Sequence, residues 1–336
     1  MNNIKVAVIG LGAMGGGIAK MVLGKKGLSL VGAYARREAK AGKDLAEVIG
    51  LDGQTGVIVT NSMDELLAAR ADVVIHAVTS FVEEAYPEIV KILSAGQNIV
   101  SIAEELAYPQ VGSPDLTAKI DEVARAGGVT VLGTGINPGF VLDALILTLT
   151  GACIEVKKIN ASRVNDLSPF GSTVMRTQGV GTTVEEFEKG LENGTIVGHI
   201  GFPESIGLIA DTLGWELDEV VQTREPIISN TYRETPYVKV HPGMVAGCRH
   251  VGIGMRAGEP LITLEHPQQI HPGEEGIETG DYIRIEGTPE INMAIKPEIP
   301  GGIGTIALAV NMIPQVINAE PGLTTMADLP IPRAFA

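Results

Sequence analysis

The chain has 336 residues, 45% hydrophobic and only 4% aromatic, so it is long enough for about two domains with cores of Val, Ile, Leu and Ala. Its net charge of −15 argues against nucleic acid or an anionic membrane as partner, because both require clustered positive charge. The most apolar segment, residues 140–154, contains Asp143 and is too short to span a bilayer. The two cysteines have no metal-ligand spacing and no signal peptide precedes Lys5, so we expect a protein of the reducing cytoplasm.

The first expected strand, residues 6–9, runs directly into a glycine motif. Gly10, Gly12 and Gly15 form G-x-G-x-x-G, and apolar residues then continue at helical spacing. The first glycine permits a tight turn, the second lets the backbone approach a pyrophosphate, and the third lets the helix pack on its strand. The free N–H groups of the helix favour the anion. Strand, motif and helix together predict a dinucleotide site at Gly10, Gly12, Ala13, Met14 and Gly15, rather than a purely structural turn.

A second strand is expected over residues 28–35, with Arg36 and Arg37 at its end. This is the position where an NAD-binding unit usually places an acid for the ribose 2′-OH, whereas an arginine suits a 2′-phosphate. We therefore expect NADP, or both NADP and NAD, to bind. The alternative is that the arginines begin a solvated helix and that Glu38 reaches the ribose.

Strands and helices continue to alternate as far as residue 150. Further strands are expected over 56–60, 72–78, 98–103 and 129–133, and helices after the capping box Ser62–Glu65 and over 81–95, 115–126 and 140–150. Such alternation predicts an α/β domain with a doubly wound parallel sheet of the Rossmann type. Ligands bind these sheets at the carboxyl ends of the strands.

Polar side chains follow three of these strands. Glu104 and Glu105 come after the fifth strand, and if the pleat continues one of them points into the nicotinamide cleft. The alternative is that both acids begin a surface turn before Pro109. Further cofactor contacts are expected from the ends of the fourth, fifth and sixth strands, at Ala77, Thr79, Ser80, Ala103, Asn137 and Pro138.

The pattern changes after residue 150. A long strand over 154–164, a glycine-rich loop over 168–181, a capping box at Thr183–Glu186 and a helix from Ser205 precede alternating, hairpin-like strands between 225 and 299. This predicts an α+β domain with a mainly antiparallel sheet, which we expect to supply a homodimer interface. Residues 301–318 are expected to form one helix that returns to the first domain, with the tail 320–336 along its surface. The expected domains are thus 1–145 completed by 301–336, and 146–300.

Four histidines in this second region, His241, His250, His266 and His271, match no zinc spacing, so no metal is expected. Three of them precede a proline, which favours turns. We expect instead that His266 or His271 lines a substrate cleft. For His199 and Glu204 we favour a capped turn before the helix at Ser205.

Several segments together resemble the 2,4-diaminopentanoate dehydrogenases, NAD(P)-dependent amine dehydrogenases of ornithine fermentation in the wider dihydrodipicolinate-reductase-like superfamily. The segments are GLGAMGGGIAK, HAVTSF, SIAEELAYP, GTGINPGFVLD, GHIGFPES and the NMIP of the last helix. Dihydrodipicolinate reductase itself carries a His-His pair and a lysine before S-G-T. The corresponding stretch here, NASRVNDLSPFGS, has neither, which argues against that reaction.

The resemblance implies oxidative deamination of (2R,4S)-2,4-diaminopentanoate, a small diamino acid, to 2-amino-4-oxopentanoate and ammonia. It assigns the general base to Glu104, with Glu105 as the alternative. The carboxylate and second amine of this substrate make Arg163 a candidate for bidentate carboxylate binding and Asn165 a candidate for a hydrogen bond to a polar substituent. Gly135 and His266 are further expected substrate contacts. Arg163 could instead pair with Asp166 or another acid of its own domain. Other possibilities are a 3,5-diaminohexanoate dehydrogenase, an imine or dihydrodipicolinate-type reductase, and a dinucleotide sensor without turnover.

Overall fold

The computed structural model describes residues 3–335 and divides the chain into two compact units. The first unit runs to Phe140 and resumes at Gly301, and the second unit is Val141–Pro300. The chain therefore changes unit after Phe140, five residues before the expected boundary. The fold class is confirmed: the first unit is built on a parallel sheet and the second on a mixed, mostly antiparallel sheet.

The parallel sheet of the first unit has seven strands in the order β15-β6-β5-β4-β1-β2-β3. Its strands are β1 Ile4–Ile9, β2 Leu28–Tyr34, β3 Val59–Thr60, β4 Val73–His76, β5 Asn98–Ser101, β6 Thr130–Gly133 and β15 Gly322–Thr324. From β1 the chain first winds toward β3 and then returns to β4 on the other side of β1. The switch point of the sheet therefore lies between β1 and β4, where ligands of such sheets bind.

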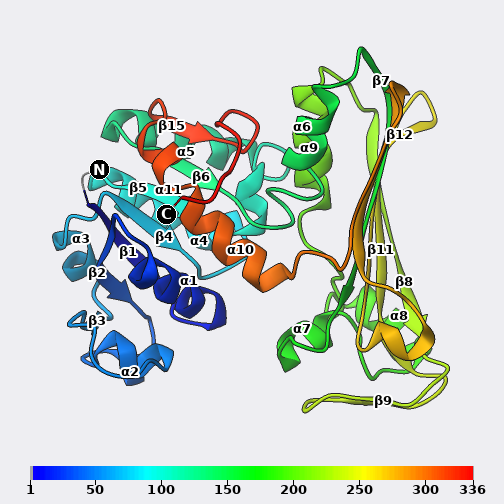
Figure 1. Cartoon of the computed structure of the whole chain (residues 1–336), viewed down its shortest axis with the longest axis horizontal. Helices are drawn as coiled ribbons and strands as arrows, with labels where there is room; N and C mark the ends of the chain where they lie inside the picture. Colours follow the sequence, from blue (N-terminus) through cyan, green and yellow to red (C-terminus); the bar gives the residue numbers. More distant parts are fainter. Residues whose placement is uncertain (1–2, 336) are drawn as a thin grey trace. The chain divides into compact units, whose positions relative to one another are not determined.

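Helices cover this sheet on both faces (Figure 1). They are α1 Ala13–Gly24, α2 Leu45–Ile49, α3 Met63–Ala68, α4 Val82–Ser94, α5 Pro114–Gly127, α10 Gly301–Asn311 and α11 Ile313–Ile317, with the 3₁₀ turns η1 Glu38–Lys40 and η2 Glu104–Ala107. Because crossover connections are right-handed and the winding reverses at the switch point, α1 and α4 lie on opposite faces. The core between α4, α5 and the sheet consists of fully buried aliphatic residues such as Val74, Ile89 and Ile99.

The C-terminal segment completes the first unit, but in a different way from the predicted one. Gly17 allows α10 to lie against α1, since a Cβ there would be 2.3 Å from the Ile306 side chain. The single helix expected over 301–318 is wrong: α10 ends at Asn311 and a second helix carries Pro314 in its first turn. The expected surface tail instead supplies β15, which extends the sheet by pairing with β6.

The second unit contains a six-stranded sheet in the order β14-β13-β7-β12-β11-β8, in which only β7 and β12 are parallel neighbours. Its elements are α6 Ala144–Thr150, β7 Glu155–Asp166, α7 Ser172–Thr177, α8 Val184–Glu192, α9 Phe202–Thr212, β8 Glu219–Ile228, β9 Arg233–Glu234, β10 Lys239–Val240, β11 Val245–Arg256, β12 Glu259–Gln269, η3 Pro272–Glu275, β13 Gly280–Thr288 and β14 Ile291–Ile295. Helix α9 packs on β11 and β12. It fits there because Gly252 has no side chain where Phe202 and Ile206 approach the sheet.

Three local predictions in this region need correction. The helix expected from residue 140 begins at Ala144, because Asp143 leaves helical geometry and accepts a hydrogen bond from the Ala144 amide. The glycine-rich stretch is not all loop, since it contains the six-residue helix α7, too short to show periodicity. Helix α9 begins at Phe202 rather than Ser205, with Pro203 in the first turn, where its missing N–H costs nothing. The capping box at Thr183 and Glu186 is confirmed.

Candidate active site

The glycine loop after β1 has the geometry of a dinucleotide site. Gly10 has φ +88°, and a Cβ there would lie 2.2 Å from the Ala77 carbonyl oxygen. A Cβ on Gly15 would lie 1.7 Å from the Gly10 oxygen, so both glycines are required by packing. At Gly12 nothing lies within 4 Å of a Cβ position, and no side chain caps the helix N–H groups. The open space and the free donors at the N-terminus of α1 fit a pyrophosphate.

The other residues predicted to bind cofactor lie at the same edge of the parallel sheet. Ala13 and Met14 begin α1, and Ala77, Thr79 and Ser80 follow β4, which neighbours β1. Ala103 follows β5, whereas Asn137 and Pro138 follow β6 together with Gly135, which was predicted as a substrate contact. The sheet order therefore brings together residues more than one hundred positions apart in sequence.

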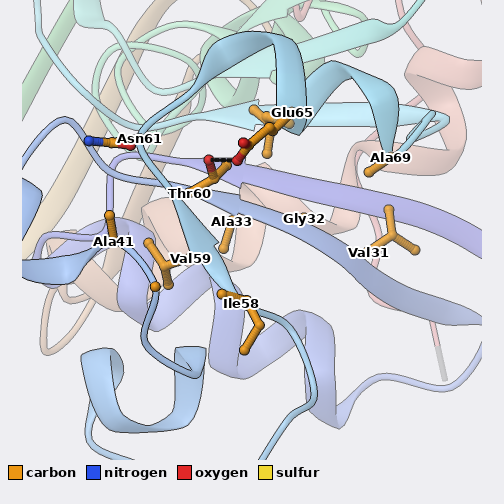
Figure 2. A pocket seen from close by; sticks show the side chains of 12 residues that line it. Val31, Gly32, Ala33, Ala41, Ile58, Val59, Thr60, Asn61, Glu65 and Ala69 are labelled. Atoms are coloured by element: carbon orange, nitrogen blue, oxygen red, sulfur yellow. Dashed lines mark hydrogen bonds between the residues drawn. The ribbon is translucent and has the colours of Figure 1, made fainter.

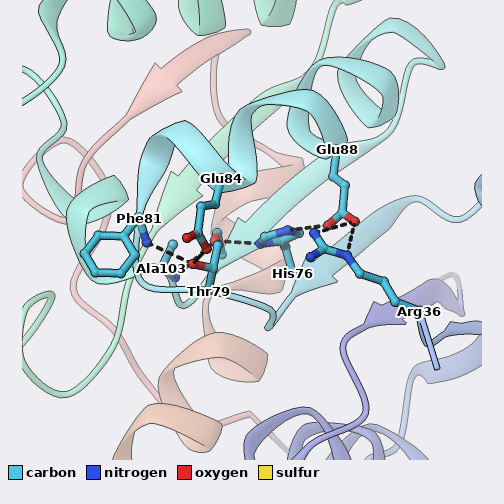
Figure 3. A network of polar contacts seen from close by, with 8 residues as sticks. Arg36, His76, Thr79, Phe81, Glu84, Glu88 and Ala103 are labelled. Atoms are coloured by element: carbon cyan, nitrogen blue, oxygen red, sulfur yellow. Dashed lines mark hydrogen bonds and ion pairs between the residues drawn. The ribbon is translucent and has the colours of Figure 1, made fainter. Parts of the chain in front are cut away.

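Arg36 does not stand free at the end of β2 (Figure 3). Its Nε and one terminal nitrogen donate to the same Glu88 oxygen, at 3.1 and 2.9 Å. The other Glu88 oxygen lies 3.0 Å from Nε2 of His76, a fully buried residue at the end of β4. Arg37 is exposed. Binding of a 2′-phosphate by Arg36 stays a prediction, and the Glu88 carboxylate would compete with the phosphate for the guanidinium.

Sequence reasoning missed another cation at the glycine loop. Lys40, in η1, donates from Nζ to the Leu11 carbonyl oxygen at 2.6 Å. This contact brings a positive charge to the middle of the G-x-G-x-x-G motif. The sequence did not predict this contact, because Lys40 lies in an ordinary charged stretch and reaches Leu11 only through the turn that η1 makes after β2.

The two acids after β5 have different surroundings. The pleat does not continue, because β5 ends at Ser101 and both acids lie in the 3₁₀ turn η2. The Glu105 carboxylate accepts a hydrogen bond from the Val82 amide at 2.8 Å, in the first turn of α4. Helix α4 has no cap from its own Phe81 side chain, so Glu105 serves as its cap.

Glu104 is half-buried and has a raised pKa. Burial is the largest cause, and the neighbouring charge of Glu105 adds to it, whereas hydrogen bonding from the Ser80 side chain opposes it. A carboxyl group whose pKa lies above its usual range is better matched to proton transfer near neutral pH than an ordinary glutamate. Of the two acids, Glu104 therefore has the environment of a general base.

A row of charged and polar side chains crosses the sheet of the second unit. The strand register pairs Arg224 with His250, His250 with His266, and Arg163 with Asp281. Arg163 is 1% exposed, and one of its terminal nitrogens lies 2.5 Å from the Asp281 carboxylate. It also donates to the Ile299 carbonyl. Arg163 thus forms the ion pair within its own domain that was the alternative to substrate binding, and its partner is Asp281 rather than Asp166.

The histidines of this row are neutral near pH 7. Burial lowers the pKa of His250 to about 3, with the nearby Arg224 charge as a second cause. Burial lowers the pKa of His199 to about 3 as well, and it holds the pKa of His266 well below its usual value. The His266–Pro267 pair lies inside β12, so the turn expected there is wrong, whereas His271 does lie in a turn.

Unpartnered polar atoms gather near this row. The sequence pointed to Asn165 among their residues, favoured a turn for His199 and gave no indication of Gln268. His199 is close to His266, with ring centroids 4.9 Å apart, and its buried Nε2 has no hydrogen-bond partner. Buried side-chain oxygens of Asn165 and Gln268 also lack partners. Buried polar atoms are normally satisfied, so each of these can pair with a bound ligand. The two amide oxygens accept a hydrogen bond, and His199 Nε2 donates or accepts according to its tautomer. Gln268 could have been found from its position two residues beyond His266 on one face of a strand.

Two hollows lie away from these residues. Figure 2 shows a pocket between β2, β3 and α3 with mostly apolar walls, in which Thr60 donates to Glu65 at 2.5 Å. Glu65 therefore does not complete the expected capping box with Ser62, although the Glu65 amide does donate to the Ser62 hydroxyl. An open groove crosses the six-stranded sheet and is lined by Asn160, Ser162, Thr263, Glu265, Tyr282, Arg284 and neighbouring residues. Neither hollow contains a residue predicted for the site.

Among residues 3–335, no group of three or more His, Cys, Asp or Glu side chains is arranged to hold a metal ion. Within the same part of the chain, no helix is both long and apolar enough to cross a membrane.

A doubly wound sheet with an open G-x-G-x-x-G loop and a half-buried carboxyl group at a nearby strand end defines an NAD(P)-dependent oxidoreductase. Comparison with known proteins narrows this class. Residues 140–336 match the 2,4-diaminopentanoate dehydrogenase C-terminal domain, and residues 4–100 match the N-terminal domain of dihydrodipicolinate reductase. The chain belongs to the 2,4-diaminopentanoate dehydrogenase family of NAD(P)-dependent amine dehydrogenases.

Individual relatives agree with this assignment. The chain is 48% identical to the 2,4-diaminopentanoate dehydrogenase of Acetoanaerobium sticklandii, over 100% of this chain and 96% of the relative. It is 27% identical to an amine dehydrogenase of Streptomyces virginiae, over 99% of this chain and 98% of the relative. The solved structure of an amine dehydrogenase from Mycobacterium smegmatis has a TM-score of 0.87 at 28% identity, over 99% of this chain and 98% of that one.

Proposed function

We propose that this enzyme catalyses NADP- or NAD-dependent oxidative deamination of (2R,4S)-2,4-diaminopentanoate at C4, giving 2-amino-4-oxopentanoate and ammonia. Family membership supports the substrate class. The observation that carries the mechanism is the half-buried Glu104, whose raised pKa and freedom from the capping role of Glu105 suit a general base.

The reaction converts a CH–NH₃⁺ group, NAD(P)⁺ and water into a carbonyl, NH₄⁺, NAD(P)H and one proton. The bound nicotinamide supplies the hydride acceptor. Glu104 first takes a proton from the substrate ammonium, because only the neutral amine can release hydride and become an iminium. Glu104 releases this proton to solvent, which is the proton of the net equation, and is again a carboxylate. It then removes a proton from the water that adds to the iminium carbon and passes it to the amino group, and the proton of the remaining hydroxyl leaves with the departing ammonia as the carbonyl forms.

The cofactor is expected to be held by residues at the carboxyl edge of the parallel sheet. The open space at Gly12 and the free N–H groups of α1 would receive the pyrophosphate. Thr79, Ser80 and Asn137 lie beyond β4 and β6, in the half of the sheet on the β4 side of the switch point, and are proposed as contacts of the nicotinamide ring. Hydride transfer requires this ring to be held in one orientation.

The polar row of the second unit is proposed to bind the charged end of the substrate. Asn165, His199 and Gln268 offer unpartnered acceptor atoms, which suit an ammonium group. Neutral histidines support this proposal, since a charged imidazolium would repel the ammonium. Arg163 keeps its guanidinium in an ion pair with Asp281, a unit without net charge, so it is proposed to hold the neighbouring polar side chains in place rather than to bind the substrate carboxylate itself.

The experiment is an assay of NAD(P)H formation with purified enzyme and a panel of amines. We expect turnover with (2R,4S)-2,4-diaminopentanoate to exceed that with its other stereoisomers, with 3,5-diaminohexanoate and with simple amines. Faster turnover of 3,5-diaminohexanoate would reassign the substrate within the same chemistry. Tight cofactor binding without turnover of any amine would refute the dehydrogenase and favour a sensor.

We further propose a homodimer through the six-stranded sheet. The supporting observation is the open groove across β7, β12, β13 and β14, whose wall includes the partly exposed Tyr282 and Met293. Sedimentation should give a mass near twice that of the chain, and Met293→Asp should shift the population toward monomer. A monomer at micromolar concentration would refute this interface.

A further inference from the structure

The chain carries a buried hydrogen-bonded series that ends on Arg36, and family membership gives it no role. It begins at the Ser101 hydroxyl, which lies 3.3 Å from Nδ1 of His76 and accepts the Ala103 amide at 3.1 Å. It continues from Nε2 of His76 to Glu88, and from Glu88 to Arg36 (Figure 3). The series crosses from the end of β5 to the end of β2.

Exposure of the side chains increases along this series, from the buried Ser101 to the exposed Arg36. The Arg36 side chain is 56% exposed and that of Glu88 only 12%, whereas His76 is fully buried. Glu88 is thus the fixed member of the Arg36–Glu88 pair, because its second oxygen is held by an immobile ring. A fixed carboxylate holds a mobile guanidinium at less entropic cost than two free side chains would require.

The bonds to Glu88 occupy one of the two edges of the Arg36 guanidinium that a phosphate could use. Nε and one terminal nitrogen both donate to a single Glu88 oxygen. This edge of a guanidinium is one of those that bind carboxylate or phosphate bidentately. Glu88 also cancels the positive charge of Arg36, so a 2′-phosphate approaching this pair meets no net charge. Lys40, bonded only to the Leu11 carbonyl, is a nearby cation with no carboxylate partner among the described residues.

We propose that Glu88, positioned by His76, controls the discrimination between NADP and NAD by occupying Arg36. With Glu88 present, Arg36 is a poor ligand for the 2′-phosphate, and the enzyme accepts both cofactors. Without the Glu88 charge, Arg36 becomes a free cation at the ribose and selects NADP. This inference rests on the proposed nucleotide site and deepens it, since it names Glu88 as the residue that weakens the attraction of Arg36 for a 2′-phosphate.

The test is calorimetric binding of NADP⁺ and NAD⁺ to Glu88→Gln and to the unaltered enzyme, without amine substrate. Glutamine keeps an oxygen for His76, removes the charge and replaces the oxygen that accepts from Arg36 by an NH₂ group, and melting curves check that the variant is folded. We expect the dissociation constant of NADP⁺ to fall about tenfold, the effect of roughly one unit charge near a phosphate in a partly exposed site. The constant of NAD⁺ should change by less than about twofold, since a ribose hydroxyl carries no charge.

Two matched variants make the outcome specific. Glu83→Gln removes the same charge from an exposed position of the same helix and should leave both constants unchanged. In an Arg36→Ala background, Glu88→Gln should improve NADP⁺ binding by about threefold or less, because only repulsion through space remains to be relieved. Adenosine 2′,5′-bisphosphate and 5′-AMP, used as competitors, should reproduce the difference between the two cofactors.

An unchanged ratio of the two constants in Glu88→Gln would overturn the proposal. So would weaker NADP⁺ binding, which would mean that Glu88 orients Arg36 for the phosphate. If neither nucleotide binds the unaltered enzyme, the proposal falls together with the nucleotide site. If both bind and only the ratio fails to respond, the proposal alone falls.

Discussion

Replacing Glu104 and Glu105 by glutamine, one at a time, distinguishes the residue that transfers protons from the residue that stabilises the fold. Glu104→Gln removes a carboxylate whose pKa is raised by burial, and Glu105→Gln removes one that caps α4 through the Val82 amide. Both substitutions keep the size of the side chain and remove one charge. We expect Glu104→Gln to lose activity without losing stability, and Glu105→Gln to do the reverse.

The expected magnitudes follow from these surroundings. Loss of a general base lowers kcat by about 10²–10⁴-fold. Replacing the charged acceptor of a helix-terminal amide by a neutral one costs about 0.5–1.5 kcal/mol of unfolding free energy. Because the folded-state pKa of Glu104 is raised, its stabilising contribution is complete below the unfolded-state pKa and is lost as pH rises through the folded-state pKa. Above that value the ionised group destabilises the fold, so Glu104→Gln should be at least as stable as the unaltered enzyme at pH 8.

The assay combines steady-state kinetics of amine oxidation with urea unfolding at about pH 4.5 and about pH 8. These values are chosen so that a carboxyl group with a raised pKa is mostly protonated at the first and mostly ionised at the second. Cofactor dissociation constants serve as the control and should match those of the unaltered enzyme in both variants. A kcat for Glu104→Gln within a factor of about three of the original value would refute the assignment of the base. A large kcat loss in Glu105→Gln at unchanged stability would transfer the role to that residue.

Three further perturbations test the geometry. Gly12→Ala should fold normally and weaken NAD(P)⁺ binding about 10–100-fold, whereas Gly10→Ala should also lose about 1–3 kcal/mol of stability, because only the latter glycine has positive φ and a crowded Cβ position. Arg163→Met should cost about 3–5 kcal/mol, as measured by urea unfolding, since it leaves a buried carboxylate unpaired. His250 has a lowered pKa, so its stabilising contribution is complete above its ordinary pKa and is lost as pH falls toward about 3. His250→Asn should therefore flatten the acid-unfolding profile by about 1.4 kcal/mol per pH unit in that interval.

Each of these predictions has a control and an opposing result. Equal stability of the two glycine variants would contradict the packing argument. Adding Asp281→Leu to Arg163→Met should recover most of the lost stability, and failure to do so would mean that the cost is not that of an orphaned charge. His241 is exposed, so His241→Asn should leave the acid profile unchanged. An unaltered profile for His250→Asn would show that this histidine titrates normally.

The local features of the first unit could be read from the sequence. The strand–glycine–helix motif at Gly10 depends on neighbouring residues alone, and alternation of apolar strands with helices defines the direction of winding. Because parallel strands present their carboxyl ends at one edge, the region of the site could be predicted without knowing the strand order. One misleading point was a short-range turn: in η2 a 3₁₀ turn replaces the expected pleat beyond β5. Another was long-range pairing, since the tail adds β15 beside β6.

The sequence by itself determined the family, the fold class and the edge of the sheet where the cofactor is expected, because these depend on local pattern and chain order. Only the tertiary structure decided which charges neutralise each other. Arg36 meets Glu88 across 52 positions, and Arg163 meets Asp281 across 118, through register and helix placement that no local pattern encodes. The same contacts distinguish Glu105, which caps α4, from Glu104, whose carboxyl group remains available for proton transfer. Two identical neighbouring side chains differ in this way because desolvation and hydrogen bonding are properties of the packed chain.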